Sequence, residues 1–313
     1  MARVLRIDRT VPSNWEEALD EFLLSKKAQG ASPRTVKDYQ YHIGLFFARY
    51  PEAWEGGSAL KTAVLKHLSQ PIATATFNIR RKYLKSFFNW CVSEGIFPKN
   101  PLAGIPKRKD EGRIRVIRAE ALKKLLELPN QKTYTGLRDY CLILLTLDIG
   151  IRPQEALSLR LWDVDLENAV LTLRKEITKN RKPASLPLSP PTVEALRRLI
   201  RARHPSWPKD APLFCTRDGA PFTVRRWQAR MRMYSERLGV EIRPYDLRHA
   251  FGTLFIRNGG NPLVLQKLLR HSSMEMVKKY VHLAQEDLKK EHEFASPANR
   301  LLPRKPRMGK VRD

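Results

Sequence analysis

Residues 244–253 read Pro-Tyr-Asp-Leu-Arg-His-Ala-Phe-Gly-Thr, and the rest of the chain can be interpreted outward from them. The stretch supplies Arg248, and the segment that follows it supplies His271 and Tyr280. A second arginine, Arg152, lies upstream in the run Gly-Ile-Arg-Pro-Gln-Glu at residues 150–155. Two arginines, a histidine and a tyrosine are the groups that transfer of a phosphodiester to a protein nucleophile needs.

The 313-residue chain carries 58 lysines and arginines against 32 aspartates and glutamates, a formal net charge of +26. Such an excess repels itself unless a polyanion is nearby, so it indicates nucleic acid, with DNA the obvious phosphodiester, or an acidic membrane surface as partner. The membrane interpretation is weaker, because the longest apolar run, around residues 141–147, is far shorter than the roughly 20 residues of a span. No signal-peptide pattern opens the chain. We therefore expect a cytoplasmic protein that acts on DNA without membrane association.

The three cysteines, Cys91, Cys141 and Cys215, lack the spacing of metal ligands, and an odd number without a disulfide framework fits a reducing cytosol. No carboxylate cluster stands out either. For the nearest candidates, Asp163 and Asp165, a turn or packing role is the better interpretation. We therefore expect neither a metal ion nor a cofactor.

The length and a hydrophobic content of 42% predict two domains that each bury a core. Helical spacing of apolar residues dominates, so the predicted fold class is mainly α with a small β-sheet in the catalytic domain. The predicted boundaries are an N-terminal arm at 1–12, a helical domain at 13–98, a basic linker at 99–118, a mixed α/β domain at 119–295 and a basic C-terminal tail at 296–313.

Four helices are expected within residues 13–98, the first with Ser13 as N-cap and Glu16 as its capping-box partner. Basic side chains occupy the outward faces of these helices. One such charge is usually just solvated, but as a set on a basic chain they are predicted to contact DNA phosphates. The set comprises Arg34, Lys37, Arg80, Arg81 and Lys85.

In the second domain the apolar period changes. Strands are expected at 169–173 and 184–188, joined by a basic turn that contains Lys179. Helices are expected near 119–128, 136–146, 153–159, 191–204, 224–238, 247–258, 262–269, 273–280 and 283–293.

Cleavage of a phosphodiester by a protein nucleophile also requires neutralisation of charge on the non-bridging oxygens and a proton for the leaving oxygen. Arg152 and Arg248 are the candidate clamp, because a guanidinium grips two oxygens and stays protonated. Tyr280 is the candidate nucleophile; with a phenol pKa of about 10, its ionisation at pH 7 costs roughly 4 kcal/mol unless cations assist. Lys179 is the candidate general acid, and His271 can bond a phosphate oxygen or assist proton movement.

Each of these residues also has an ordinary explanation. A tyrosine on a helix, such as Tyr280, is most often a core residue, and Lys179 fits an ordinary turn charge. Arg152 can pair with Glu155, three positions on, and His249 can simply pack beside Arg248. The residues alone therefore leave a structural role open for every candidate.

The motifs taken together resemble the tyrosine recombinases, or phage integrase family, over about residues 13–292, and are similar to Xer-type and transposon-type integrases. The resemblance rests on the run at 150–159, on Thr178-Lys179 ahead of the run at 186–188, on residues 246–249 with Phe251 and Thr253, and on residues 269–273 through 280–282. In the last of these, Tyr280 follows His271 by nine positions.

The resemblance implies that residues 13–98 form the core-binding (DNA-binding) domain and residues 119–295 the catalytic domain, and that the two clamp DNA as a C shape. It also implies that Tyr280 forms a 3′-phosphotyrosine while freeing a 5′-hydroxyl. Strands then exchange without ATP or metal, in integration, excision or dimer resolution. The family works as a tetramer on two DNA sites, with a C-terminal segment, here 283–296, docking on a neighbour. An accessory directionality protein is a further partner that the resemblance allows.

Two positions depart from the family pattern. Tyr245, included among the candidate catalytic residues, stands where the family usually has a histidine, and a phenol is a poor proton acceptor at neutral pH. Arg270 replaces the usual glycine before His271 and is expected either to contact phosphate or to cap the local turn.

No arm-binding domain is expected before residue 13. The rival functions are relaxation of DNA by a type IB topoisomerase and DNA binding without catalysis.

Overall fold

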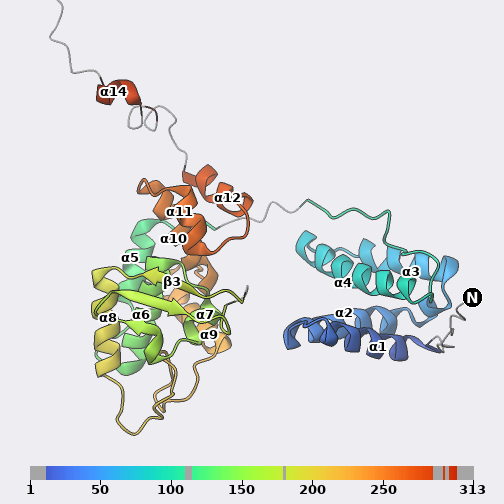
Figure 1. Ribbon diagram of the computed structural model, residues 1–313, viewed down its shortest axis with the longest axis horizontal. Coiled ribbons are helices and arrows are strands. Elements are labelled where there is room, and N and C mark those ends of the chain that lie inside the picture. The colour runs from blue at the N-terminus through green and yellow to red at the C-terminus, as the bar shows by residue number, and fades with distance from the viewer. Residues whose placement is uncertain (1–11, 110–114, 179–180, 285–291, 293–295, 302–313) are drawn as a thin grey trace, which may run out of the picture. The chain divides into compact units, whose positions relative to one another are not determined.

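The computed structural model describes residues 12–109, 115–178, 181–284, 292 and 296–301. The chain divides into two compact units, Met1–Gly112 and Arg113–Asp313, called here the helical unit and the catalytic unit. The described part of the chain is mainly helical, with a three-stranded sheet in the catalytic unit (Figure 1). The predicted fold class is confirmed.

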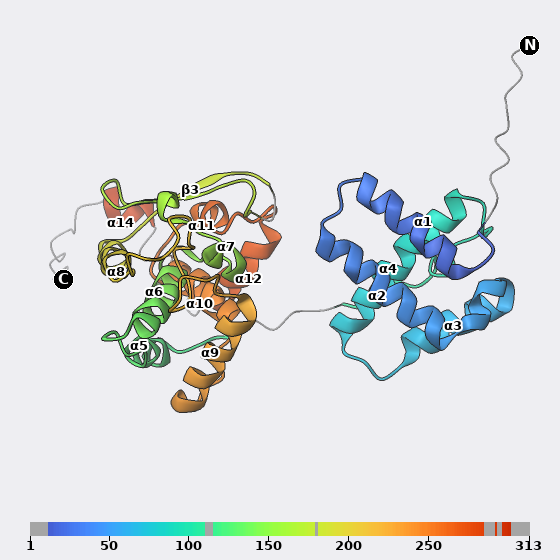
Figure 2. The same cartoon turned by 90° about the horizontal axis from the view of Figure 1, so that it is seen from below.

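The helical unit consists of α1 (Trp15–Ala28), α2 (Pro33–Arg49), the 3₁₀ turn η1 (Pro51–Glu55), α3 (Gly57–Ser69) and α4 (Thr74–Ser93), which pack on one another as Figure 2 shows. Its core is largely aromatic. Phe22 meets Tyr39 and Phe87 edge-on, with ring centroids 5.0 and 5.4 Å apart. Such edge-to-face pairs stabilise the unit in addition to the burial of apolar area by its aliphatic and aromatic side chains.

The N-cap of the first helix lies one residue later than expected. Asn14, not Ser13, is the N-cap, and its side chain accepts the Glu17 backbone N–H at 2.9 Å. The Ser13 hydroxyl and N–H both donate to the Glu17 carboxylate at 2.9 Å. The expected pair of Ser13 with Glu16 is therefore wrong, because Asn14 competes as a cap of equal quality.

Residues 99–109, expected to open the linker, pack on the helical unit. Leu102 is fully buried in its core. Asn78 exchanges two hydrogen bonds with the backbone of Arg108, whose guanidinium lies 3.8 Å from the ring centroid of Phe77. The Arg81 guanidinium donates to the carbonyl of Ile105 at 2.6 Å. These contacts bind the segment to α4.

The catalytic unit contains the expected helices from 119–128 through 273–280 in the predicted order, whereas most of the helix expected near 283–293 lies outside the described residues. Its helices are α5 (Ala119–Glu127), α6 (Tyr134–Ile149), α7 (Pro153–Leu157), α8 (Pro190–Arg201), α9 (Val224–Leu238), α10 (Pro244–Arg257), α11 (Pro262–Leu269) and α12 (Glu275–Ala284), with α14 (Pro297–Leu301) beyond them. The short helix at Pro297–Leu301 lies where only a tail was expected. Helix α6 is buried on most of its surface, and α10 packs on both α6 and α12. Helix α10 therefore connects the core to the helix that carries Tyr280.

The sheet is antiparallel in the order β1 (Val164–Asp165), β2 (Val170–Leu173) and β3 (Ala184–Pro187). Val170 lies opposite Pro187, and Leu173 lies opposite Ala184. The pair β2–β3 is the predicted hairpin. Strand β1, preceded by the 3₁₀ turn η2 (Leu161–Asp163), was not predicted, because two residues are too few to show alternation.

Both aspartates weighed as metal ligands have structural roles. Asp163 is buried and forms an ion pair with Arg174 at 2.8 Å. Asp165 accepts the backbone N–H groups of Glu167 and Asn168 and so closes the turn into β2. The described residues hold no group of three or more His, Cys, Asp or Glu side chains that could bind a metal ion.

A charged network lies in the core of the catalytic unit. Asp139, fully buried on α6, accepts from Arg138 at 2.7 Å, from Arg230 at 2.6 Å and from the Tyr234 hydroxyl at 2.9 Å.

The thiols of Cys91, Cys141 and Cys215 are free and buried. Of the helices that the structure describes, none combines the length and apolar character needed to cross a membrane.

Candidate active site

Arg248 lies at the centre of the candidate site. Helix α10 begins at Pro244, three residues before its expected start, because Pro244 occupies the first position and Asp246 accepts the Arg243 N–H at 2.8 Å. Arg248 is 3% exposed. Its guanidinium donates to the carbonyl of Gly150, to that of Leu269 at 2.6 Å and to Nε2 of His271 at 3.2 Å. It thereby joins the end of α6 to the end of α11.

Arg152 sits at the N-terminus of α7 and shares a carboxylate with Arg270. Its guanidinium donates to Glu155 at 3.0 Å, and Arg270 forms an ion pair with the other oxygen of the same buried carboxylate. The expected pairing of Arg152 with Glu155 is present. One carboxylate therefore balances two guanidinium groups, and the site keeps a positive charge.

His271 is held as a neutral ring. Its Nε2 accepts from Arg248, so the proton of the neutral imidazole lies on Nδ1. Burial, together with the charges of Arg248 and Arg152, lowers the pKa of His271 to about 4. Buried Nδ1 has no hydrogen-bond partner among the described residues. At neutral pH the ring therefore presents one unused donor.

Tyr280 is 2% exposed, and its ring lies nearly parallel to that of His271, with centroids 6.3 Å apart. Its hydroxyl is 3.0 Å from Nδ1 of His249. A Cβ at Gly252 would lie 2.8 Å from the tyrosine ring, so only glycine allows α10 to approach this closely. Burial raises the pKa of Tyr280, while the charges of Arg248 and Arg152 oppose that rise.

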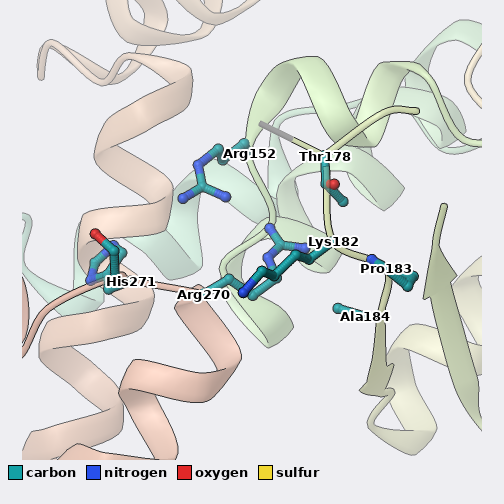
Figure 3. A pocket seen from close by; sticks show the side chains of 8 residues that line it. Arg152, Thr178, Lys182, Pro183, Ala184, Arg270 and His271 are labelled. Atoms are coloured by element: carbon teal, nitrogen blue, oxygen red, sulfur yellow. The ribbon is translucent and has the colours of Figure 1, made fainter. Parts of the chain in front are cut away.

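A cavity of about 570 Å³ opens beside these groups (Figure 3). It is lined by the side chains that Figure 3 draws, among them Arg152, Lys182, Arg270 and His271. Arg248 and Tyr280 do not line it but contact His271, which does. The cavity has the charge and hydrogen-bond donors needed by an anionic group of phosphate size.

The candidate residues have three outcomes. Arg152, Arg248, His271 and Tyr280 come together from α7, α10, the end of α11 and α12. Lys179 lies outside the described residues. Tyr245 is 52% exposed and lines a different hollow, with Arg243 and Gln228.

Sequence reasoning missed His249, which it left as a packing residue beside Arg248. A signal for it was present, because a histidine followed directly by Ala250 and Phe251 is a polar group entering an apolar helical run. Burial lowers the pKa of His249, Asp246 raises it, and the charges of Arg248 and Lys279 lower it further. His249 is therefore a neutral group in hydrogen-bond contact with Tyr280.

The residues predicted to contact DNA differ in their freedom to do so. Arg34 is exposed and pairs with Asp38 at 3.0 Å, and Lys37 is exposed. Arg80 donates to Gln70 and Arg81 to Ile105, so both are half-buried and engaged within the helical unit. Lys85 lines a hollow of about 530 Å³ that also includes Arg81, Lys82 and Lys107. The DNA-contact assignment stays a prediction.

The model of the phage integrase family matches residues 115–287, more than half of the chain. Tyrosine recombinase XerC of Proteus mirabilis is 26% identical over 298 residues, which cover 92% of this chain and 96% of that protein. XerC of Chlamydia caviae is 27% identical over 244 residues, covering 76% and 77%.

Two solved structures share the fold. A lambda integrase (75–356) dimer bound to a COC′ core site has a TM-score of 0.69 at 16% identity, covering 87% of this chain and 96% of that one. XerH bound to a palindromic difH substrate in a post-cleavage complex has a TM-score of 0.67 at 21% identity, covering 89% and 83%.

Proposed function

The chain belongs to the phage integrase family and is a tyrosine-type site-specific DNA recombinase, and from this premise we propose that it cleaves and rejoins double-stranded DNA through a 3′-phosphotyrosine at Tyr280. The observation that carries the proposal is the meeting of Arg152, Arg248 and His271 beside a buried tyrosine hydroxyl. The finer proposals are that the reaction uses neither metal nor ATP and that a tetramer forms on two DNA sites.

The scissile phosphate enters the cavity beside His271. Arg152 neutralises the charge that gathers on its non-bridging oxygens, and the unused Nδ1–H of neutral His271 donates to one of them. Arg248 does not line the cavity, so its guanidinium joins them only when DNA binding moves the phosphate toward it. Preorganised donors in a partly dehydrated site are worth about 10²–10³ in rate each. Because Tyr280 does not line the cavity, DNA binding must bring its hydroxyl to the phosphorus before attack.

Attack forms the bond from the phenolic oxygen to phosphorus and breaks the bond from phosphorus to the 5′ oxygen. The phenol loses its proton, and the departing oxygen gains one as the 5′-hydroxyl. His249 accepts the phenolic proton in this proposal, because its neutral Nδ1 is already 3.0 Å from the hydroxyl. Lys179 is proposed as the donor to the 5′ oxygen, on the resemblance of its motif.

The test uses a negatively supercoiled plasmid library with random inserts, in a metal chelator. Covalent protein–DNA adducts are trapped with detergent, and the linked peptide and DNA are mapped. We expect adducts through Tyr280 at a recurring sequence. Tyr280→Phe should form none but should still bind DNA. Tyr245→Phe, which makes the same substitution at an exposed tyrosine, should leave the adduct yield unchanged.

Equal adduct yield from Tyr280→Phe would overturn the assignment of the nucleophile. Adducts scattered over all sequences, with relaxation of the plasmid, would instead favour a topoisomerase-like activity. Retained DNA binding without adducts in the wild type would favour a DNA-binding protein without catalysis.

A further inference from the structure

Arg270 holds a backbone conformation that suits glycine. It ends α11 with φ 52° and ψ 48°, in the left-handed region. A side chain is strained there, because its Cβ approaches the following carbonyl. Among the described residues, the other non-glycine residues at positive φ are Ala169 and Arg181. Strain kept at a cavity wall implies a compensating use for the side chain.

Capping of the turn does not explain an arginine here. The backbone N–H of Arg270 donates to the carbonyls of Gln266 and Lys267, and this closes α11. Any residue supplies a backbone N–H, and glycine would do so without strain. The guanidinium therefore has to be explained by what it contacts.

The guanidinium is only partly satisfied. One terminal nitrogen pairs with Glu155, but Nε and the other terminal nitrogen are buried and have no partner among the described residues. Unpaired buried side-chain nitrogens also occur, among those residues, on His42, His67 and His271. Two of the four side chains in this condition, Arg270 and His271, are thus neighbours on one cavity wall.

The cavity places these unused donors beside more positive charge. Arg152 and Lys182 line it with Arg270, and Figure 3 shows the three side chains gathered around the same space. Leaving a buried donor unsatisfied destabilises the fold, and a charged donor does so more than a neutral one. An oxyanion with several acceptor oxygens would satisfy Nε, the free terminal nitrogen and Nδ1 of His271 together.

We propose that Arg270 is a third phosphate-binding arginine of this site, gripping the non-bridging oxygens of the scissile phosphodiester through Nε and its free terminal nitrogen. The inference rests on the proposed function for the identity of the phosphodiester. Glu155 fixes the guanidinium in place, and His271 binds the same phosphate through Nδ1–H.

The test compares Arg270→Gly, which removes the guanidinium and relaxes the backbone, with Arg270→Lys, which keeps the charge without the planar fork. Arg181→Gly is the matched control, because Arg181 also has a left-handed backbone, with φ 51°, but is exposed and does not line the cavity. Adduct formation is measured on the mapped DNA site with a normal scissile phosphate and with an uncharged methylphosphonate there.

We expect Arg270→Gly to form adducts about 10²-fold more slowly on the phosphate, the size typical of one lost oxyanion donor. On the methylphosphonate, which has less charge to neutralise, its rate should approach that of the wild type. Arg181→Gly should match the wild type on both substrates. Equal rates for Arg270→Gly and the wild type on the normal phosphate would overturn the proposal.

A second measurement separates this inference from the proposed function. Inorganic phosphate is titrated into the full-length protein while the His271 ring is followed by nitrogen NMR. We expect phosphate to shift the His271 signal in the wild type and in Arg181→Gly, but not in Arg270→Gly. If no adduct forms in any protein and this difference persists, the anion site stands and the cleavage proposal fails. If phosphate shifts all three alike, the role of Arg270 is refuted.

Discussion

Two regions of the catalytic unit bury an arginine equally, but only one of them pairs the arginine with a carboxylate. Arg138 and Arg248 are each 3% exposed. Arg138 donates two hydrogen bonds to Asp139, at 3.0 and 2.7 Å, and lies 3.7 Å from the ring centroid of Phe222. Arg138 therefore has a direct counter-charge inside the fold, although Asp139 also pairs with Arg230 at 2.6 Å.

Arg248 has no such counter-charge. It donates to two carbonyls and to His271, and no ion pair joins it to a carboxylate within the described part of the chain. Burial and the neighbouring charges of Arg152 and Arg270 lower its pKa to about 10. Burial alone therefore does not distinguish a structural arginine from a ligand-binding one, whereas the absence of a paired carboxylate does.

The largest expected effect on stability comes from removing the carboxylate that pairs with Arg138. Asp139→Ala leaves Arg138 buried without its partner and should lower the free energy of unfolding by about 3–5 kcal/mol. Arg248→Gln should lower it by less than half as much, because it removes a cation that its neighbours repel. Adduct formation by Arg248→Gln should nevertheless fall about 10²–10³-fold.

Calorimetric unfolding of the full-length proteins measures the first effect, and single-turnover adduct yield measures the second. If Arg248→Gln proved the more destabilising of the two, the distinction between the regions would collapse.

An intermediate effect concerns the proton of Tyr280. The acceptor form of His249 is its neutral form, which is lost as the pH falls through its pKa. That pKa is lowered by burial, Arg248 and Lys279 and raised only by Asp246. The cleavage rate should therefore hold steady from pH 8 through about 6.5, the ordinary histidine value, and fall only in more acid solution.

His249→Gln should lower the plateau about 10²-fold, as expected for a lost proton acceptor, and should remove that part of the acid fall. The measurement is a pH profile of single-turnover cleavage for both proteins, with circular dichroism as the control for folding. An unchanged profile in the variant would leave His249 with a packing role only.

The smallest effect compares two glycines in helices. A Cβ at Gly252 on α10 would lie 2.8 Å from the Tyr280 ring, whereas a Cβ at Gly44 on α2 meets nothing within 4 Å. Gly252→Ala should cost about 1–3 kcal/mol of stability through overpacking and should also slow cleavage by displacing the ring. Gly44→Ala should stabilise the helical unit by about 0.5–1 kcal/mol. Thermal unfolding of both variants checks the pair, and destabilisation by Gly44→Ala would contradict it.

Sequence patterns predicted the elements whose apolar spacing is long and regular. Helix α9 was expected near residues 224–238 and spans Val224–Leu238. The predicted helix starts were wrong where capping residues set the boundary. Asn14 replaces Ser13 as the N-cap of α1, and Pro244 begins α10 earlier than its apolar residues indicate. Strand β1 is fixed by pairing with β2, which local sequence does not encode.

For the candidate site, motif spacing identified Arg152, Arg248, His271 and Tyr280, which the fold brings together. It did not indicate that the Tyr280 hydroxyl meets His249, because that contact depends on which face of α10 packs on α12. It placed Tyr245 in the site by position alone, although the side chain is exposed and lines a different hollow, with Gln228 and Arg243. Relations between distant elements are set by tertiary packing, so they could not be predicted from local patterns.

The buried thiols give each unit a chemical reporter of its own opening. Cys91 lies in the core of the helical unit, and Cys141 lies in that of the catalytic unit. Burial raises the pKa of Cys91 and raises that of Cys141 to about 12, so neither is a reactive thiolate in the closed fold. An alkylating reagent modifies each thiol only when its surroundings unfold. The rates of labelling at the two positions therefore report how often each unit opens, in one experiment on the unaltered chain.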